Sequence, residues 1–104
     1  GPVSLSDGNV TLTNATHSGR ILLVPDGSQD NTYTLPSPIA GSTFRFVYAG
    51  GAADGTDAII LTPGNTNFYN VPAGFDVTIV GLNTTNYQIF GNVTGATAPA
   101  FADQ

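Results

Sequence analysis

The sequence predicts an all-β fold, either an antiparallel β-sandwich or a small β-barrel of about eight strands. The chain has 104 residues and no Lys, Glu or Met, three of the residues from which helices are usually built. It has instead 14 Thr, 13 Gly, 9 Asn, 8 Val and 7 Pro, which are typical of short strands and tight turns. Apolar and polar residues also alternate with a period of two along much of the chain, as half-buried strands do. No segment shows a convincing helical pattern or an internal repeat.

The expected strands follow one another at the spacing of a sandwich or barrel. Five segments alternate between apolar and polar residues: 9–13, 31–35, 43–48, 75–80 and 85–90. Two more segments, 21–24 and 58–61, are apolar at every position. Such runs are either central strands covered on both sides or strands that meet another subunit. A short strand around Phe68 and Tyr69, bracketed by turns that contain Pro and Gly, is the eighth.

The alternation also predicts which side chains form the core. Phe44 and Phe46 share one face of their strand, and Val77 and Ile79 share one face of another. We expect these four side chains to be buried together.

The length is that of one domain, and we expect it to span residues 3–95. Gly1 and Pro2 are interpreted as the remnant of an expression tag. Residues 96–104 are rich in small side chains and are expected to form an extended tail, with Phe101 as its one bulky apolar anchor.

Charge and composition exclude several kinds of partner. The formal net charge is −5, from seven Asp and two Arg. Binding to nucleic acid or to an anionic membrane surface needs clustered Lys and Arg, so neither is expected. The chain has no Cys, which excludes disulfides and thiolate metal sites. No apolar run has the length of a membrane-spanning segment.

Catalytic and metal-binding residues are scarce. His17 is the one His, and Ser18 beside it does not make a catalytic triad, so we interpret His17 as a turn residue. Asp26 and Asp30, and likewise Asp54 and Asp57, lie in expected loops, but neither pair has the spacing of an EF-hand calcium loop. We therefore expect no enzyme activity, no cofactor and no metal ion.

Several apolar residues lie on strand faces that are otherwise polar, namely Val47, Val80 and Phe90. A single sandwich has one inner layer, and apolar faces in excess of it usually mark association, so we expect a homotrimer. Arg45 lies in mid-strand on the face opposite Phe44 and Phe46. It is expected to be solvated, to pair with a carboxylate such as Asp76 on another strand, or to lie in an interface. With Phe101 in the tail, the predicted interface residues are Arg45, Val47, Val80, Phe90 and Phe101.

Exposed aromatic residues suggest an alternative. Tyr48, Phe68, Tyr69 and Tyr87 could stack on the rings of a carbohydrate. Aromatic residues on strands more often belong to a core or an interface, so a host glycan is the second partner considered.

One stretch resembles a known pattern. Residues 17–24 (HSGRILLV) are followed by a strand that ends in Thr34-Leu35-Pro36, a short turn with Gly41, and a strand with Phe44 and Phe46. This arrangement is similar to modules of tailed-bacteriophage virion proteins: head decoration proteins, head fibres and tail-associated fibres. The likeness covers roughly residues 17–48, with the strand at 58–60 fitting loosely.

The resemblance implies a trimeric protein of the virion surface and transfers no active-site residue. We therefore expect a structural virion protein that decorates or cements the capsid exterior of a tailed phage, with the major capsid protein or another virion component as its partner. The alternative is a phage fibre or receptor-binding domain that recognises host surface glycans.

Overall fold

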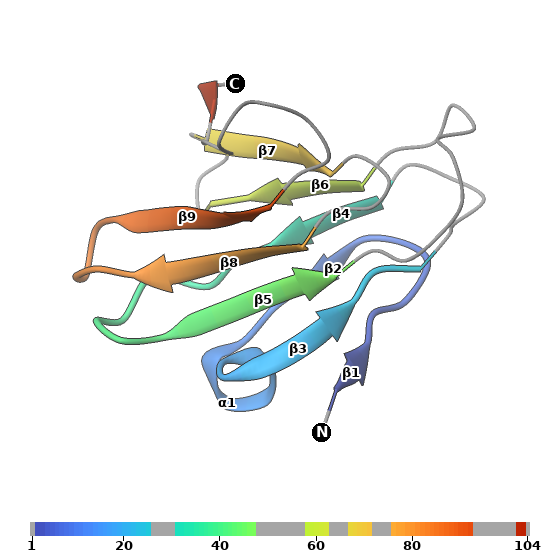
Figure 1. Cartoon of the computed structure of the whole chain (residues 1–104), viewed down its shortest axis with the longest axis horizontal. Helices are drawn as coiled ribbons and strands as arrows, with labels where there is room; N and C mark the ends of the chain where they lie inside the picture. Colours follow the sequence, from blue (N-terminus) through green and yellow to red (C-terminus); the bar gives the residue numbers. More distant parts are fainter. Residues whose placement is uncertain are drawn as a thin grey trace.

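The computed structural model describes residues 2–25, 31–47, 58–62, 67–71, 76–92 and 102–103, which form two five-stranded sheets and one short helix. Sheet A has the strand order β1-β3-β5-β8-β9, and sheet B has the order β10-β7-β6-β4-β2 (Figure 1). The elements are β1 (Val3–Ser4), β2 (Val10–Thr11), α1 (Asn14–His17), β3 (Arg20–Leu23), β4 (Asn31–Thr34), β5 (Thr43–Val47), β6 (Ala58–Leu61), β7 (Asn67–Val71), β8 (Asp76–Gly81), β9 (Tyr87–Asn92) and β10 (Ala102–Asp103). The predicted all-β class is confirmed, and of the two architectures the sandwich is the one found.

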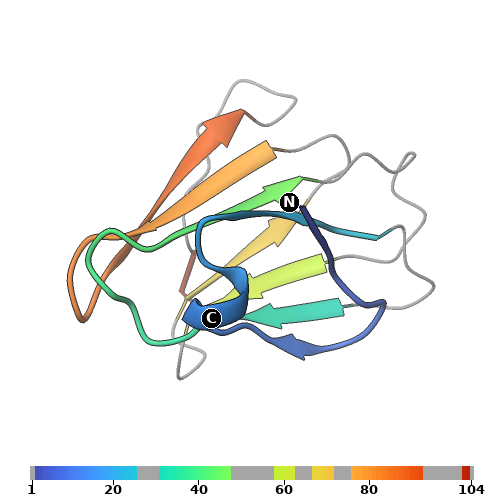
Figure 2. The same ribbon diagram turned by 90° about the horizontal axis from the view of Figure 1, so that it is seen from below.

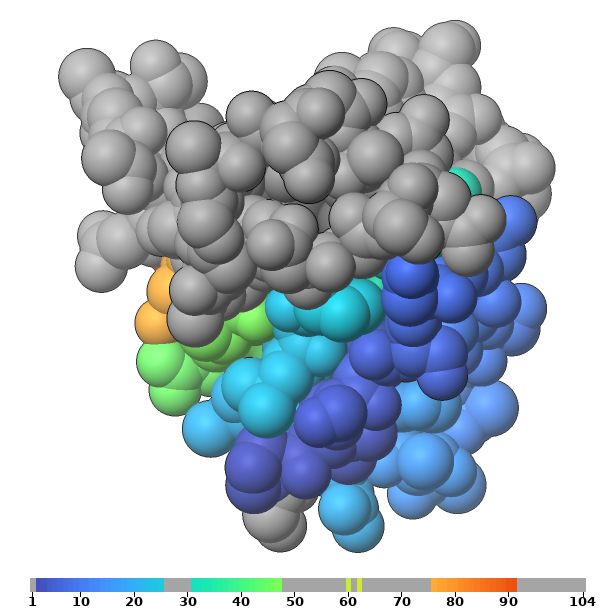
Figure 3. Space-filling view, turned by 90° about the vertical axis from the view of Figure 1, so that its right-hand side faces the viewer, coloured from blue at the N-terminus to red at the C-terminus, as the bar shows by residue number. Residues whose placement is uncertain are grey.

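The first six strands alternate between the two sheets, so the chain winds around the core in three coils. The coils are β1 with β2, β3 with β4, and β5 with β6. Neighbouring coils stack through parallel ladders, β1 on β3 on β5 in one sheet and β2 on β4 on β6 in the other. In Figure 3 the colours run from blue through cyan and green to orange, the order of β1, β3, β5 and β8 across sheet A. This winding is that of a short parallel β-solenoid.

The purely antiparallel pairing expected from the sequence is therefore wrong for half of the ladders. The four ladders between coils are parallel, whereas β5–β8, β8–β9, β6–β7 and β7–β10 are antiparallel. Parallel neighbours need a long crossover connection. Here each crossover is supplied by a strand of the opposite sheet.

The eight expected strands all appear among the described residues, as β2 to β9. The helix α1 was not expected, because a single turn is too short to show a helical period. Its start is capped by Thr13, whose Oγ1 accepts a hydrogen bond from the backbone N–H of Thr16 at 3.2 Å. The turn carries the chain from β2 in sheet B to β3 in sheet A.

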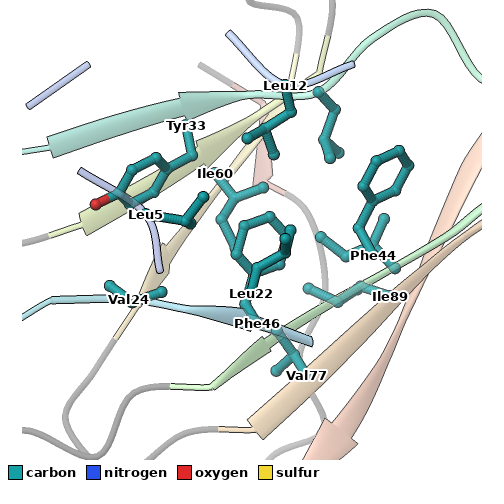
Figure 4. Packing of buried hydrophobic residues seen from close by; sticks show 12 residues of the cluster. Leu5, Leu12, Leu22, Val24, Tyr33, Phe44, Phe46, Ile60, Val77 and Ile89 are labelled. Atoms are coloured by element: carbon teal, nitrogen blue, oxygen red, sulfur yellow. The ribbon is translucent and has the colours of Figure 1, made fainter. Parts of the chain in front are cut away.

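The two sheets face each other (Figure 2), and the buried hydrophobic side chains lie between them (Figure 4). The predicted cluster of Phe44, Phe46, Val77 and Ile79 is confirmed, since all four side chains are fully buried. Tyr33 and Ile60 meet them from sheet B. The segments that lead from one sheet to the other also contribute buried residues, which follow the ends of β1 to β4: Leu5, Leu12, Val24 and Leu35.

The β8–β9 hairpin closes against the loop between β4 and β5. Gly81 donates its N–H to the carbonyl of Ser42 at 2.8 Å, and Gly41 donates its N–H to the carbonyl of Gly81 at 2.9 Å. A Cβ on Gly81 would collide with the carbonyl oxygen of Ile39. Gly is therefore required where these two segments meet.

Little of the predicted tail is described. Ala102 and Asp103 form β10, which pairs antiparallel with β7 in the register Ala102 with Phe68 and Asp103 with Asn67. A strand is itself an extended conformation, so β10 agrees with the expected tail at these two residues. Phe101 lies outside the described residues.

Candidate interaction surface

Sheet A brings four of the five predicted interface residues onto one surface. We call this surface, the side of sheet A turned away from the core, the outer face. In its middle row Ile21, Arg45, Thr78 and Phe90 are paired strand to strand. Beside it lies a row of Leu23, Val47 and Asp76, and on the other side a row of Thr43, Val80 and Gln88. The fifth predicted residue, Phe101, is outside the described part.

The strand period explains why these side chains share one face. Phe44 and Phe46 point into the core, so Thr43, Arg45 and Val47 must point out. The burial pattern of β5 follows this alternation residue by residue. The positions that the sequence singled out as surplus apolar residues are thus the positions that the fold leaves on the outside.

The outer face exposes a large amount of apolar side chain. Ile21 and Leu23 are each 38% exposed, and Phe90 is 51% exposed. They are three of the five large hydrophobic residues that are exposed in the described part of the chain; the others are Ile39 and Leu82. Exposed apolar groups gathered on one face are a feature of interaction surfaces, whereas single ones are ordinary.

Ile21 and Leu23 were not among the predicted interface residues, although their segment gave a signal. The run 21–24 is apolar at every position, and the two explanations considered were burial on both sides or contact with another subunit. In β3, Leu22 is fully buried while Ile21 and Leu23 are not covered by the described chain. For β3 the explanation by burial on both faces is therefore wrong.

An ion pair lies among these apolar residues. Arg45 donates from Nε to Asp76 Oδ1 at 2.9 Å and from Nη2 to Asp76 Oδ2 at 2.6 Å. The two side chains are 47% and 44% exposed. Asp76 lies diagonally across the β5–β8 ladder from Arg45, since it pairs with Val47. The pairing that the sequence suggested for Arg45 is confirmed, and the two-point geometry fixes the direction of the guanidinium group.

The pair shifts the pKa of both groups. The hydrogen bonds from Arg45 lower the pKa of Asp76 below its usual value, and those to Asp76 raise the pKa of Arg45. Because the pKa of Asp76 is lowered in the folded chain, the pair stabilises the fold above the ordinary pKa of Asp. That stabilisation is lost as the pH falls through the lowered value. Since both groups are about half exposed, it is small.

His17 has a local structural role, as expected for a turn residue. Its Nδ1 accepts a hydrogen bond from the backbone N–H of Thr13 at 2.9 Å. The side chain of Thr13 caps the N-terminal end of the same helical turn. His17 therefore closes α1 on itself, and this nitrogen is occupied by a backbone donor.

The predicted loop carboxylates Asp26, Asp30, Asp54 and Asp57 lie outside the described residues. Within the ranges that the structure describes, no group of three or more His, Cys, Asp or Glu side chains could hold a metal ion. The helix found in those ranges is also too short to cross a membrane.

Of the four aromatic side chains considered for carbohydrate stacking, Tyr87 is the one whose side chain is described. Its ring meets Phe44 edge to face, with the ring centroids 6.2 Å apart. Its hydroxyl donates to the carbonyl oxygen of Pro36 at 2.5 Å. Burial raises the pKa of Tyr87 to about 12. This side chain is thus committed to packing between β5, β9 and the β4–β5 loop.

Comparison with known proteins adds no relative: no family model, no curated protein and no solved structure matches this chain.

Proposed function

We propose that this chain is a structural virion protein that decorates or cements the capsid exterior of a tailed phage, and that it acts as a homotrimer. The observation that supports the proposal best is the outer face of sheet A, where Ile21, Leu23 and Phe90 stay exposed on a rigid surface. The resemblance of residues 17–48 to modules of phage virion proteins supports the virion as the location.

The mechanism would be mechanical. The outer face buries its apolar side chains against a neighbouring protein and thereby gains roughly 25 cal/mol for each Å² removed from water. Two sheets around one close-packed core hold that face in a fixed shape, so little conformational entropy is lost on docking. A protein of this kind adds contacts between shell subunits and needs no reacting group.

The direct test is to locate the protein on phage particles. Antibodies against the chain should label the exterior of purified virions, and cryo-electron microscopy should show density of this size at repeated positions on the shell. The purified protein should also sediment with capsids that lack it. Absence from purified particles, together with no binding to such capsids, would overturn the proposal.

The oligomeric part of the proposal has its own measurement. Light scattering of the purified protein should give three times the chain mass of 10.6 kDa. A monomer at high protein concentration would contradict the homotrimer. Binding to a glycan array, without binding to capsids, would favour the receptor-binding alternative.

A further inference from the structure

The charges on the outer face add information about what covers it. Two copies of a chain with a net charge of −5 repel each other over most orientations. On the outer face, however, the described charged groups are Arg45 and Asp76, which form an ion pair with each other. The local charge therefore sums to zero on the same face that exposes Ile21, Leu23 and Phe90.

The ion pair also keeps capacity for further hydrogen bonds. A guanidinium group has five N–H donors, and two of those on Arg45 point to Asp76. A carboxylate can accept about four hydrogen bonds, so Asp76 can take more than the two it receives from Arg45. Because both groups are close to half exposed, these sites are accessible from outside the chain.

We propose that the outer face of sheet A joins copies of this chain around a rotation axis, and that Arg45 of each copy also contacts Asp76 of the next. The inference rests on the proposed function and names the partner of the same surface. A closed symmetric assembly presents the same surface of every copy to the axis. Guanidinium and carboxylate groups then alternate in a ring, and Ile21, Leu23 and Phe90 exclude water around it.

The test exchanges the charges. The variant Arg45→Asp carries two carboxylates on the outer face, and the variant Asp76→Arg carries two guanidinium groups. In each variant alone, like charges meet across the axis, so self-association should weaken by more than about tenfold in sedimentation velocity. An equimolar mixture of the two variants should associate more strongly than either variant alone and less strongly than the parent. In a mixed trimer two of the three contacts join an acidic face to a basic one, and the third joins like faces.

Two further variants serve as controls. The double variant Arg45→Asp with Asp76→Arg restores one opposite charge at each position and should associate like the parent. Thr11→Asp adds a carboxylate at an exposed position of β2 in sheet B, away from the outer face of sheet A, and should leave association unchanged. Circular dichroism and thermal unfolding establish that every variant is folded.

Each result decides the inference. Association that survives in both single variants shows that this face is not the contact between copies. If association is lost in both single variants and their mixture shows no gain over either one alone, the ion pair acts only within one chain. A parent that stays monomeric yet sediments with capsids overturns the inference and leaves the virion role standing. If association responds to the charge exchange as expected but the parent does not bind capsids, the inference is supported and the proposed virion role is contradicted.

Discussion

Single residues decide the energetics of this small core. Phe46 has no exposed surface and sits where β5 faces Leu22 on one side and Val77 on the other. These neighbours are held by ladders on both sides of β5, so they cannot move in to fill a void. A small domain has roughly 5–15 kcal/mol of stability, and one such residue carries a large share of it.

Phe46→Ala is expected to lower the free energy of unfolding by about 3–5 kcal/mol, because it leaves a cavity in a rigid core. Urea denaturation measures the change. The matched control is Leu82→Ala, an apolar truncation at a 51% exposed position, which should change stability by less than about 0.5 kcal/mol. A loss below about 1 kcal/mol for Phe46→Ala would show that the neighbouring side chains close the cavity, which contradicts a rigid core at this position.

The raised pKa of Tyr87 predicts how the free energy of unfolding changes at alkaline pH. Its pKa is raised to about 12 in the folded chain, through burial, while an unfolded chain has the ordinary value near 10. The stabilisation from the protonated hydroxyl is therefore complete below pH ~10 and is lost as the pH rises towards ~12.

Tyr87→Phe should cost about 1 kcal/mol at neutral pH, because the carbonyl of Pro36 loses its donor. The difference in unfolding free energy between parent and variant should then shrink between pH ~10 and ~12. Denaturation at a series of pH values measures it, and Tyr33, whose pKa burial also raises, is present in both proteins and cancels. A constant difference across this range would contradict the assignment.

The period of two made the residues of the core predictable, and with them the outer face. Because side chains alternate along a strand, a core position for Phe44 and Phe46 puts Arg45 and Val47 on the opposite face, and this needs no knowledge of the neighbouring strands. The ion pair needed more: Asp76 reaches Arg45 because β8 pairs with β5 in one particular register, and a sequence does not state register between distant strands. Asp76 was accordingly named only as one example of a carboxylate on another strand.

At the level of elements, strands were predictable and their partners were not. Each expected strand has its own alternation and turn residues, which are local signals. The helix α1 depends on Thr13, Thr16 and His17, a set of hydrogen bonds with no periodic pattern. The strand β10 is too short for alternation to be visible. At β1 the run Val3-Ser4-Leu5-Ser6 does alternate, and the prediction missed this signal.

Gly81→Ala tests the contact between two elements, the β8–β9 hairpin and the loop before β5. The added methyl group would meet the carbonyl of Ile39 and would lie 2.6 Å from Ser42 Oγ. Because one of these neighbours is backbone, we expect a loss of about 3 kcal/mol. Thermal or urea unfolding measures it.

The control for Gly81→Ala is Gly41→Ala in the same contact region. Gly41 has a φ of 87°, but nothing lies within 4 Å of an added Cβ. The substitution should therefore lower the free energy of unfolding only through backbone strain, by about 1 kcal/mol. Equal losses in the two variants would show that the hairpin yields easily and that the close approach is not required.

At the scale of the whole molecule, the winding explains why no repeat was visible in the sequence. Val3 pairs with Leu22, 19 residues later, and Leu22 pairs with Phe46, 24 residues later. In sheet B the corresponding steps from Val10 to Tyr33 and from Tyr33 to Ile60 are 23 and 27 residues. The number of residues per coil therefore changes from one coil to the next, and a search for a fixed period fails under those conditions.

Sheet B ends at β10, which adds the last described residues of the chain to β7, and this gives a prediction for the tail. Deletion of residues 96–104 removes a strand pairing, Ala102 with Phe68 and Asp103 with Asn67, and also removes Phe101. We expect a lower melting temperature and a lower oligomeric mass, measured by calorimetry and light scattering. The substitution Phe101→Ala separates the two contributions, since it leaves the backbone of β10 unchanged. If Phe101→Ala reproduces the effect of the deletion, the aromatic anchor dominates, and if it has no effect, the strand pairing does. A shortened chain that matches the parent in both measurements would show that the tail holds nothing together, and that β10 is a weak edge pairing of the kind that frays at chain ends.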